Sequence, residues 1–133
     1  MTEEGLIKQS IKSYLERVLK GFVVSISTTG IYDEKKGRFR SNKTQVGTSD
    51  LLYFIAGTCI GIEVKTEKEY KFVSKHYERL SDPFKCKTKR DKHLHDQIIF
   101  INHLKSTGNH GFFTYSIFDT QTKLSKILSR NAK

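Results

Sequence analysis

The segment Leu51-Leu-Tyr-Phe-Ile-Ala-Gly-Thr-Cys-Ile-Gly-Ile-Glu-Val-Lys65 decides the fold. It holds two runs rich in β-branched and aromatic residues, and the Ala-Gly pair at 56–57 between them is typical of a tight turn. The segment therefore predicts a β-hairpin in the middle of the chain. If a two-residue turn pairs Ile55 with Thr58, position 50 lies opposite position 63, because paired positions in a hairpin have a constant sum.

Patterns on either side of this hairpin predict helices and further strands. Apolar residues recur at three- and four-residue spacing in the segments expected to be helical, which are 3–19, 93–106 and 120–130. Runs of β-forming residues predict strands at 22–26 and 111–117. We expect a long basic loop at 28–48, and an irregular, charged segment at 66–92 with one short helix near 73–80.

The order of these elements predicts the fold class. Three consecutive strands, and then a helix that crosses over to a fourth strand, indicate a mixed sheet flanked by helices. A chain of 133 residues is long enough for one domain with its own core. We therefore expect a single α/β domain over residues 1–133, with the order αβββαβ followed by a C-terminal helix.

The net charge indicates the kind of partner. The chain has 24 Lys and Arg against 14 Asp and Glu, which gives +10 and a pI near 9.6. This excess favours a polyanion such as nucleic acid, although a merely basic protein is the simpler alternative. No apolar run of about 18 residues occurs, so no membrane partner is expected. Without a secretion signal, Cys59 and Cys86 are expected to be reduced thiols in the cytoplasm.

The residues that carry chemistry are Asp50, Glu63 and Lys65. Side chains alternate along a strand, so Glu63 and Lys65 share one face, and Gly61 on that face is expected to leave space beside them. Two carboxylates roughly 5 Å apart repel each other unless a cation lies between them. Oxygen ligands with open water positions suit Mg²⁺ or Mn²⁺, and a nearby lysine can hold a water or neutralise phosphate charge. In the competing hypothesis Asp50 only caps a strand, and Glu63 and Lys65 form an exposed ion pair.

This pattern resembles the PD-(D/E)XK nuclease superfamily, and within it the VRR-NUC branch. The matching elements occur in the family's order over roughly residues 4–117, and Ser49 stands where the family usually has Pro. They are Glu4 at the head of a helix, Gly47-Thr-Ser-Asp50, Gly61-Ile-Glu-Val-Lys65, Gln97 on a later helix, and Gly108-Asn-His-Gly111. The resemblance implies a restriction-endonuclease-like αβββαβ core.

The resemblance also implies roles for these residues. Asp50, Glu63 and the backbone carbonyl of Val64 would bind the metal, and Lys65 would orient the attacking water or stabilise the transition state. Glu4, for which Glu3 is a competitor, would act through water or a second metal, and Gln97 would position Lys65, water or phosphate. It further implies a Mg²⁺-dependent (or Mn²⁺-dependent) endonuclease for branched DNA such as Holliday junctions, a standalone, junction-resolvase-like homodimer in a prokaryotic or phage-infected cell.

Basic side chains in two segments are candidates for binding DNA. We expect the densest stretch to be a loop that follows phosphates, through Lys85, Lys87, Lys89, Arg90 and Lys92. Arg38, Arg40 and Lys43 precede the Asp50 motif and are further candidates by position. A solvated charge run is the alternative for the dense stretch. Zinc binding by Cys86, His93 and His95 is disfavoured, because their spacing matches no usual zinc pattern.

Two functions from different classes remain open. The first is the DNA endonuclease, and nothing in the residues themselves selects a four-way junction over a flap, plain duplex or RNA. The second is a non-catalytic basic nucleic-acid-binding module in which the acidic pair is only structural. Loss of cleavage in variants of Asp50, Glu63 and Lys65 that still bind nucleic acid would distinguish the first from the second.

Overall fold

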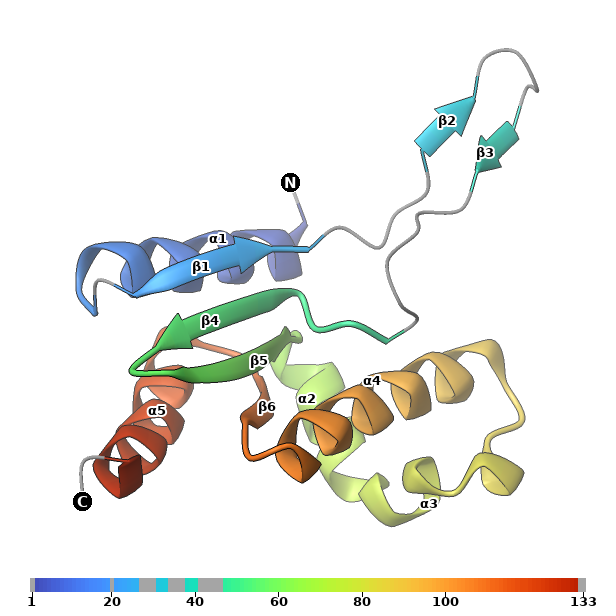
Figure 1. Cartoon of the computed structure of the whole chain (residues 1–133). Coiled ribbons are helices and arrows are strands. Elements are labelled where there is room, and N and C mark those ends of the chain that lie inside the picture. Colours follow the sequence, from blue (N-terminus) through green and yellow to red (C-terminus); the bar gives the residue numbers. More distant parts are fainter. Residues whose placement is uncertain (1, 20, 27–30, 34–37, 41–46, 132–133) are drawn as a thin grey trace.

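The computed structural model describes residues 2–19, 21–26, 31–33, 38–40 and 47–131, and the side chains of residues 2–19, 21–26 and 47–129. Figure 1 shows a four-stranded sheet with helices on both faces. Along the chain the elements are α1 (Glu3–Arg17), β1 (Phe22–Ser25), β2 (Ile31–Asp33), β3 (Arg38–Arg40), β4 (Leu51–Ile55), β5 (Thr58–Val64), α2 (Glu67–Lys75), α3 (Tyr77–Ser81), the 3-10 turn η1 (Pro83–Lys85), α4 (Lys89–Ser106), β6 (His110–Thr114) and α5 (Ile117–Asn131).

The central hairpin has the predicted register. β4 and β5 are antiparallel, Ile55 pairs with Thr58, and Leu51 pairs with Ile62. Ala56 and Gly57 form the turn with φ of 51° and 75°, which is the backbone that two-residue hairpins favour. The predicted register, in which the numbers of paired residues add up to a constant, therefore holds along the whole of β4.

The main sheet is mixed, as expected. Its strand order is β1-β4-β5-β6; β1 and β4 are antiparallel, whereas β5 and β6 are parallel and are connected through α2, α3 and α4. The α/β class, the helices around a mixed sheet and the C-terminal helix α5 are thus confirmed.

Two hydrophobic cores lie on opposite faces of the sheet. On one face, α1 and α5 bury residues from both central strands, among them Leu51, Tyr53, Ile60, Ile62 and Val64. On the other face, α2, α3 and α4 pack around Leu94, Ile98 and Phe113. The alternation of β5 thus sends Ile60, Ile62 and Val64 into the first core and leaves Gly61 and Glu63 facing α4.

The prediction of an unstructured loop at 28–48 was wrong in part. β2 and β3 form an antiparallel two-stranded sheet separate from the main one, in which Tyr32 pairs with Phe39. The short apolar alternation in each strand, with polar residues between, produces this ribbon. The strongly polar composition of the segment concealed the pattern.

The prediction of an irregular stretch at 66–92 with one helix near 73–80 was also wrong. The Thr66 hydroxyl caps α2 by accepting from Glu69 N, and the Thr88 hydroxyl caps α4 by accepting from Asp91 N. Each Thr is followed three residues later by an acid, which is a helix-start signal. α4 therefore begins at Lys89 instead of 93, and part of the expected basic loop is helical.

Membrane spans were sought among the helices of the described ranges. None of these helices combines the length and the apolar character that crossing a bilayer requires.

Gly61 allows α4 to pack closely on β5. A β-carbon at this position would lie 2.5 Å from Leu104 Cδ1 and 2.8 Å from Ser49 Oγ. The space that Gly61 was expected to leave is therefore filled by these two side chains. The missing side chain brings the helix to the strand instead of opening a cavity.

This packing predicts the effect of Gly61→Ala. The added methyl should destabilise the fold by about 1 kcal/mol, the low end of the usual cost of overpacking, because the atoms that must move are the ends of the Leu104 and Ser49 side chains. Denaturant unfolding measures the change, and Leu104→Ala in the same chain should recover part of it. A Gly61→Ala protein as stable as the wild type would contradict the close approach of α4.

Candidate active site

The C-terminal end of β5 buries a carboxyl group next to an amine. Glu63 and Lys65 are 2% and 3% exposed. Lys65 Nζ lies 3.7 Å from Glu63 Oε1 and 3.7 Å from Glu69 Oε1, which α2 supplies. Glu63 and Lys65 do form an ion pair, as the competing hypothesis has it. That hypothesis is wrong in placing the pair on the surface, because both side chains are buried.

Asp50 lies beside Glu63, directly before β4. Its Oδ2 accepts a hydrogen bond of 2.9 Å from Val64 N, and its charge acts directly on the Glu63 carboxyl. Lys8 of α1 places Nζ 3.9 Å from Asp50 Oδ1. The two carboxylates thus meet on one side of the sheet, as the hairpin register required.

Gly47 explains how the chain delivers Asp50 to this place. Its φ is +82°, a conformation that side chains disfavour, and a β-carbon there would collide with the backbone carbonyl of Asp96 on α4. Ser49 follows, 1% exposed, and lies over Gly61. The segment before β4 is therefore pressed between α4 and the sheet, and Asp50 emerges next to Glu63.

Gln97 connects α4 to the acidic pair. Its Nε2 donates 2.7 Å to Glu63 Oε1 and lies 3.1 Å from Nε2 of His93, one turn earlier on the helix. Three buried polar atoms at this place have no hydrogen-bond partner within the described residues: Glu63 Oε2, Gln97 Oε1 and Ser49 Oγ. Buried polar atoms are nearly always paired, so these are the atoms through which the site would accept a ligand.

The pKa of Glu63 shows how unfavourable its ionised form is here. Burial, and then the negative charge of Asp50, raise this pKa well above the ordinary 4.5, although Lys65 acts in the opposite direction. A buried carboxyl with a raised pKa beside a second acid is typical of a functional site. A cation beside the pair would relieve both effects.

Glu4 joins the same site from the start of α1. It is half-buried, whereas Glu3 is exposed, so the structure selects Glu4 of the two. Its pKa is raised mainly by burial and further by Asp50 and Glu69, and it is lowered by Lys65 and Lys8. Glu4 is therefore close enough to interact electrostatically with Asp50, Lys65, Glu69 and Lys8.

Three residues of the cluster were missed in the sequence: Lys8, Glu69 and His93. Each is four residues from a predicted site residue, namely Glu4, Lys65 and Gln97 respectively. Glu4 and Lys8 lie on α1, and His93 and Gln97 lie on α4, so this spacing places each pair on one helix face and was the signal that could have found Lys8 and His93. Lys65 precedes α2, so the same signal did not apply to Glu69.

The donor set fits a hard divalent cation. Asp50 and Glu63 offer adjacent carboxylates, and the Val64 carbonyl is the third candidate ligand. Within the described ranges, no group of three or more His, Cys, Asp and Glu side chains has the arrangement of a metal cage. Two carboxylates that leave most positions to water are what Mg²⁺ commonly uses, so the residues present suit Mg²⁺ or Mn²⁺.

The basic candidates are only partly described. Lys85, Lys87, Lys89, Arg90 and Lys92 are all exposed. The backbones of Arg38 and Arg40 belong to β3, but their side chains, and all of Lys43, lie outside the described part of the chain.

The three residues considered for zinc have separate partners. His93 faces Gln97, His95 Nδ1 lies 2.7 Å from the Leu80 carbonyl, and Cys86 Sγ lies 3.4 Å from the Asp82 carbonyl.

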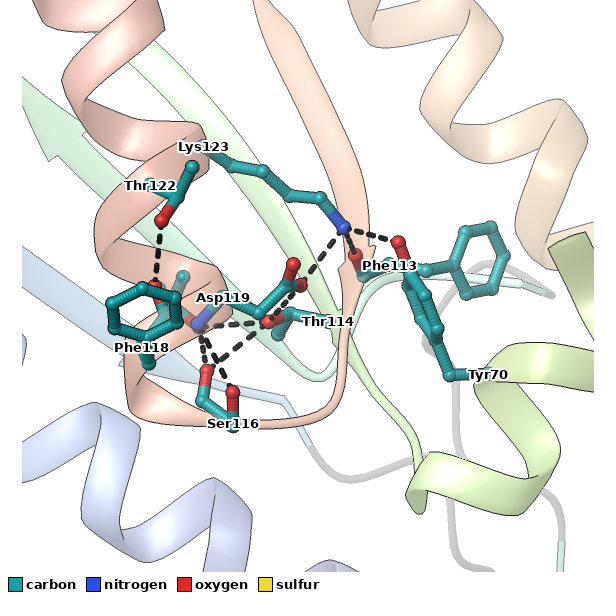
Figure 2. Close-up of polar contacts among 9 residues, drawn as sticks. Tyr70, Phe113, Thr114, Ser116, Phe118, Asp119, Thr122 and Lys123 are labelled. Carbon is teal, nitrogen blue, oxygen red and sulfur yellow. Dashed lines mark hydrogen bonds and ion pairs between the residues drawn. The ribbon is translucent and has the colours of Figure 1, made fainter.

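A polar network behind Lys65 holds its backbone. Lys65 N donates 2.8 Å to the carbonyl of Thr114 at the end of β6. Lys123 of α5 donates to the Phe113 carbonyl (2.6 Å), the Tyr70 hydroxyl (2.8 Å) and Asp119 Oδ2 (2.8 Å), as Figure 2 shows. The network ties α2, β6 and α5 together around the strand end that carries Lys65.

The raised pKa of Glu63 predicts a pH-dependent stability. A carboxyl whose pKa is higher in the folded state than in the unfolded state stabilises the fold at low pH, and this contribution is lost as pH rises through the folded pKa. Glu63→Gln cannot ionise, so from pH 5 to pH 9 in EDTA its melting temperature should rise relative to that of the wild type. Thermal unfolding at several pH values measures this difference, and parallel pH profiles would contradict the assignment.

A second arm of the experiment tests the cation. Mg²⁺ should raise the melting temperature of the wild type at pH 8 but not that of Glu63→Gln, because binding to the folded state alone stabilises it. An equal rise in the melting temperature of both proteins would mean that the cation binds at another site.

A comparison with protein-family models, curated proteins and solved structures finds no match to this chain. The case for a function therefore rests on the residues and the geometry described above.

Proposed function

We propose that this protein is a Mg²⁺-dependent endonuclease that hydrolyses phosphodiester bonds of DNA. One observation carries the proposal: the buried Glu63 carboxyl, with one oxygen lacking a partner within the described residues, lies between Asp50 and Lys65. A fold gains little stability from a buried acid next to a second, partly buried one, whereas a Mg²⁺ site uses such a pair.

Each residue has a role in this proposal. Asp50, Glu63 and the Val64 carbonyl hold the cation, which when bound would polarise the phosphoryl group and lower the pKa of the attacking water. Gln97 holds Glu63 Oε1 and leaves Oε2 free for binding. Lys65 provides a positive charge for that water or for the phosphate, and Glu69 keeps its amine in place.

The net charge of +10 supports a polyanionic substrate, and exposed lysines near the start of α4 support DNA binding beside the site. The resemblance to VRR-NUC nucleases adds branched DNA, such as a Holliday junction, as the preferred substrate. It also adds a homodimer, and the expectation of reduced cysteines adds a cytoplasmic location. Two copies would bring two such sites to one junction.

A binding module without catalysis is the second candidate, and one contact favours it. The Glu63 carboxyl already pairs with Lys65, so this acid has a cation of its own. In that case nucleic acid would bind through the surface lysines, and binding would depend on salt but not on Asp50 or Glu63.

A cleavage panel separates the two candidates. With Mg²⁺ the wild type should cut a four-way junction, flap or duplex DNA, and EDTA should abolish cutting. Asp50→Ala, Glu63→Gln and Lys65→Met should each reduce the rate by more than about a hundredfold while DNA affinity changes little. Rates are measured on labelled DNA, with RNA and single-stranded DNA as comparisons.

Glu67 and Lys71 offer the matched control. They form a 3.2 Å ion pair on the exposed face of α2, so Glu67→Gln and Lys71→Met change the same residue types on the surface. These variants should cut like the wild type. Full cutting by Glu63→Gln, or metal-independent cutting, would overturn the proposal in favour of another active site, and DNA binding without any cutting by the wild type would favour the binding module.

A further inference from the structure

Phe84 is an exposed aromatic side chain within the basic segment between α3 and α4. It is 84% exposed, the highest value among the large apolar residues that the structure describes. It lies in η1, which precedes the end of α4 that points away from β6 (Figure 1). A single exposed phenyl is ordinary on a protein surface, so its support and its neighbours decide what it means.

The turn that carries Phe84 is firmly anchored. Asp82 Oδ1 accepts from Phe84 N at 2.9 Å, and the thiol of Cys86, 3% exposed, lies 3.5 Å from the Leu80 carbonyl. Arg79 of α3 forms an ion pair of 2.5 Å with Asp91 of α4. The backbone on both sides of the phenyl group is thus fixed, and the ring is held out in water.

The surface charge around Phe84 is mostly positive. Five cationic side chains are exposed over residues 85–92: Lys85, Lys87, Lys89, Arg90 and Lys92. The two acids of this segment are engaged, Asp82 with a backbone N–H and Asp91 with Arg79. An exposed aromatic ring among exposed lysines suits a polyanion with flat apolar groups, which is single-stranded or distorted nucleic acid.

We propose that Phe84 stacks on a base exposed at a branch, gap or fork in DNA, while the surrounding lysines bind the flanking phosphates. This inference rests on the proposed nuclease function and names the substrate class for the same site. A phenyl ring has no hydrogen-bonding group, so it selects an unstacked base without selecting its identity. In a continuous duplex every base is already stacked, so such DNA would contact only the lysines and not Phe84.

The length of α4 allows one DNA strand to reach both the basic start of the helix and the acidic site. From Gln97 in the acidic site, α4 runs back eight residues to Lys89, which is about 12 Å along the helix. His93 lies between them and is exposed beside Gln97. DNA rises about 3.4 Å per base step, so this helix segment matches three or four steps. A strand that follows this helix segment would thus place the phosphates bound at Lys89 several nucleotides from the acidic site.

Binding in EDTA tests the inference without cleavage. Affinity is measured by fluorescence anisotropy for a continuous duplex and for the same duplex with a central branch. The wild type should prefer the branched DNA, and Phe84→Ala should bind it about tenfold more weakly, the loss expected for one aromatic–base stack, with little change for the duplex. Phe84→Trp should keep the preference.

Two controls isolate stacking from charge and from exposure. Lys87→Gln should weaken binding to both DNAs by a similar factor, because phosphate contacts ignore DNA structure. Phe118 is 77% exposed at the start of α5, next to Asp119 instead of lysines, so Phe118→Ala should change neither affinity.

The outcomes for this inference and for the nuclease proposal are separate. An unchanged branched-to-duplex ratio in Phe84→Ala, or an equal loss in Phe118→Ala, overturns the stacking role even if the protein cuts DNA. A selective loss in Phe84→Ala supports stacking even if the wild type cuts nothing, and in that case the nuclease proposal fails alone.

Discussion

The packing of α4 against β5 is the constraint on which the candidate site depends. Gly61 lets Leu104 and Ser49 lie directly on the strand, and Gly47 lets the preceding segment press against the backbone of α4. This closeness buries Glu63 and brings Gln97 within hydrogen-bond distance of it. Burial then raises the pKa of Glu63, because a charge is poorly stabilised away from water. The electrostatics of the site thus follow from two positions that have no side chain.

The site is also supported from the side of β6. Lys65 is bound through its backbone to Thr114, and through its amine to Glu63 and Glu69. Tyr70, the residue after Glu69, receives a hydrogen bond from Lys123 of α5. Two helices, α2 and α5, and two strands, β5 and β6, therefore support the position of Lys65. An amine held in this way loses little further freedom when a phosphate arrives, which is the benefit of preorganisation.

The acidic site and the basic surface belong to different parts of the same helix. The middle of α4 supplies Gln97 to the buried carboxylates, while its first turns display cations to solvent. On α4, the residue that meets the carboxylates is buried, whereas the cations of its first turns are exposed. A polyanion would be attracted to the surface first and would meet the carboxylates only through a bound cation.

Local patterns in the chain determined much of the fold and of the site. The alternation of residues 58–64 and the tight turn before them predicted the hairpin and its register, and the register alone placed Asp50 opposite Glu63. Helix periodicity predicted α1 and α5 closely, and most of α4. The missed capping threonines Thr66 and Thr88 were also local signals. Periods of two and of 3.6 residues are properties of the backbone, so a sequence can display them without any tertiary contact.

Only the tertiary structure decided which of the polar residues meet. The chain contains 14 acids, and spacing could not show that Glu4 and Glu69 join Asp50 and Glu63, since these four residues come from α1, α2 and the ends of two strands. Nor could spacing show that Gly61 closes a gap instead of opening one. The burial of Glu63, its raised pKa, and the absence of a partner for its Oε2 among the described residues are properties of the packed interior. They arise only when distant segments exclude water together, and for that reason no local pattern contains them.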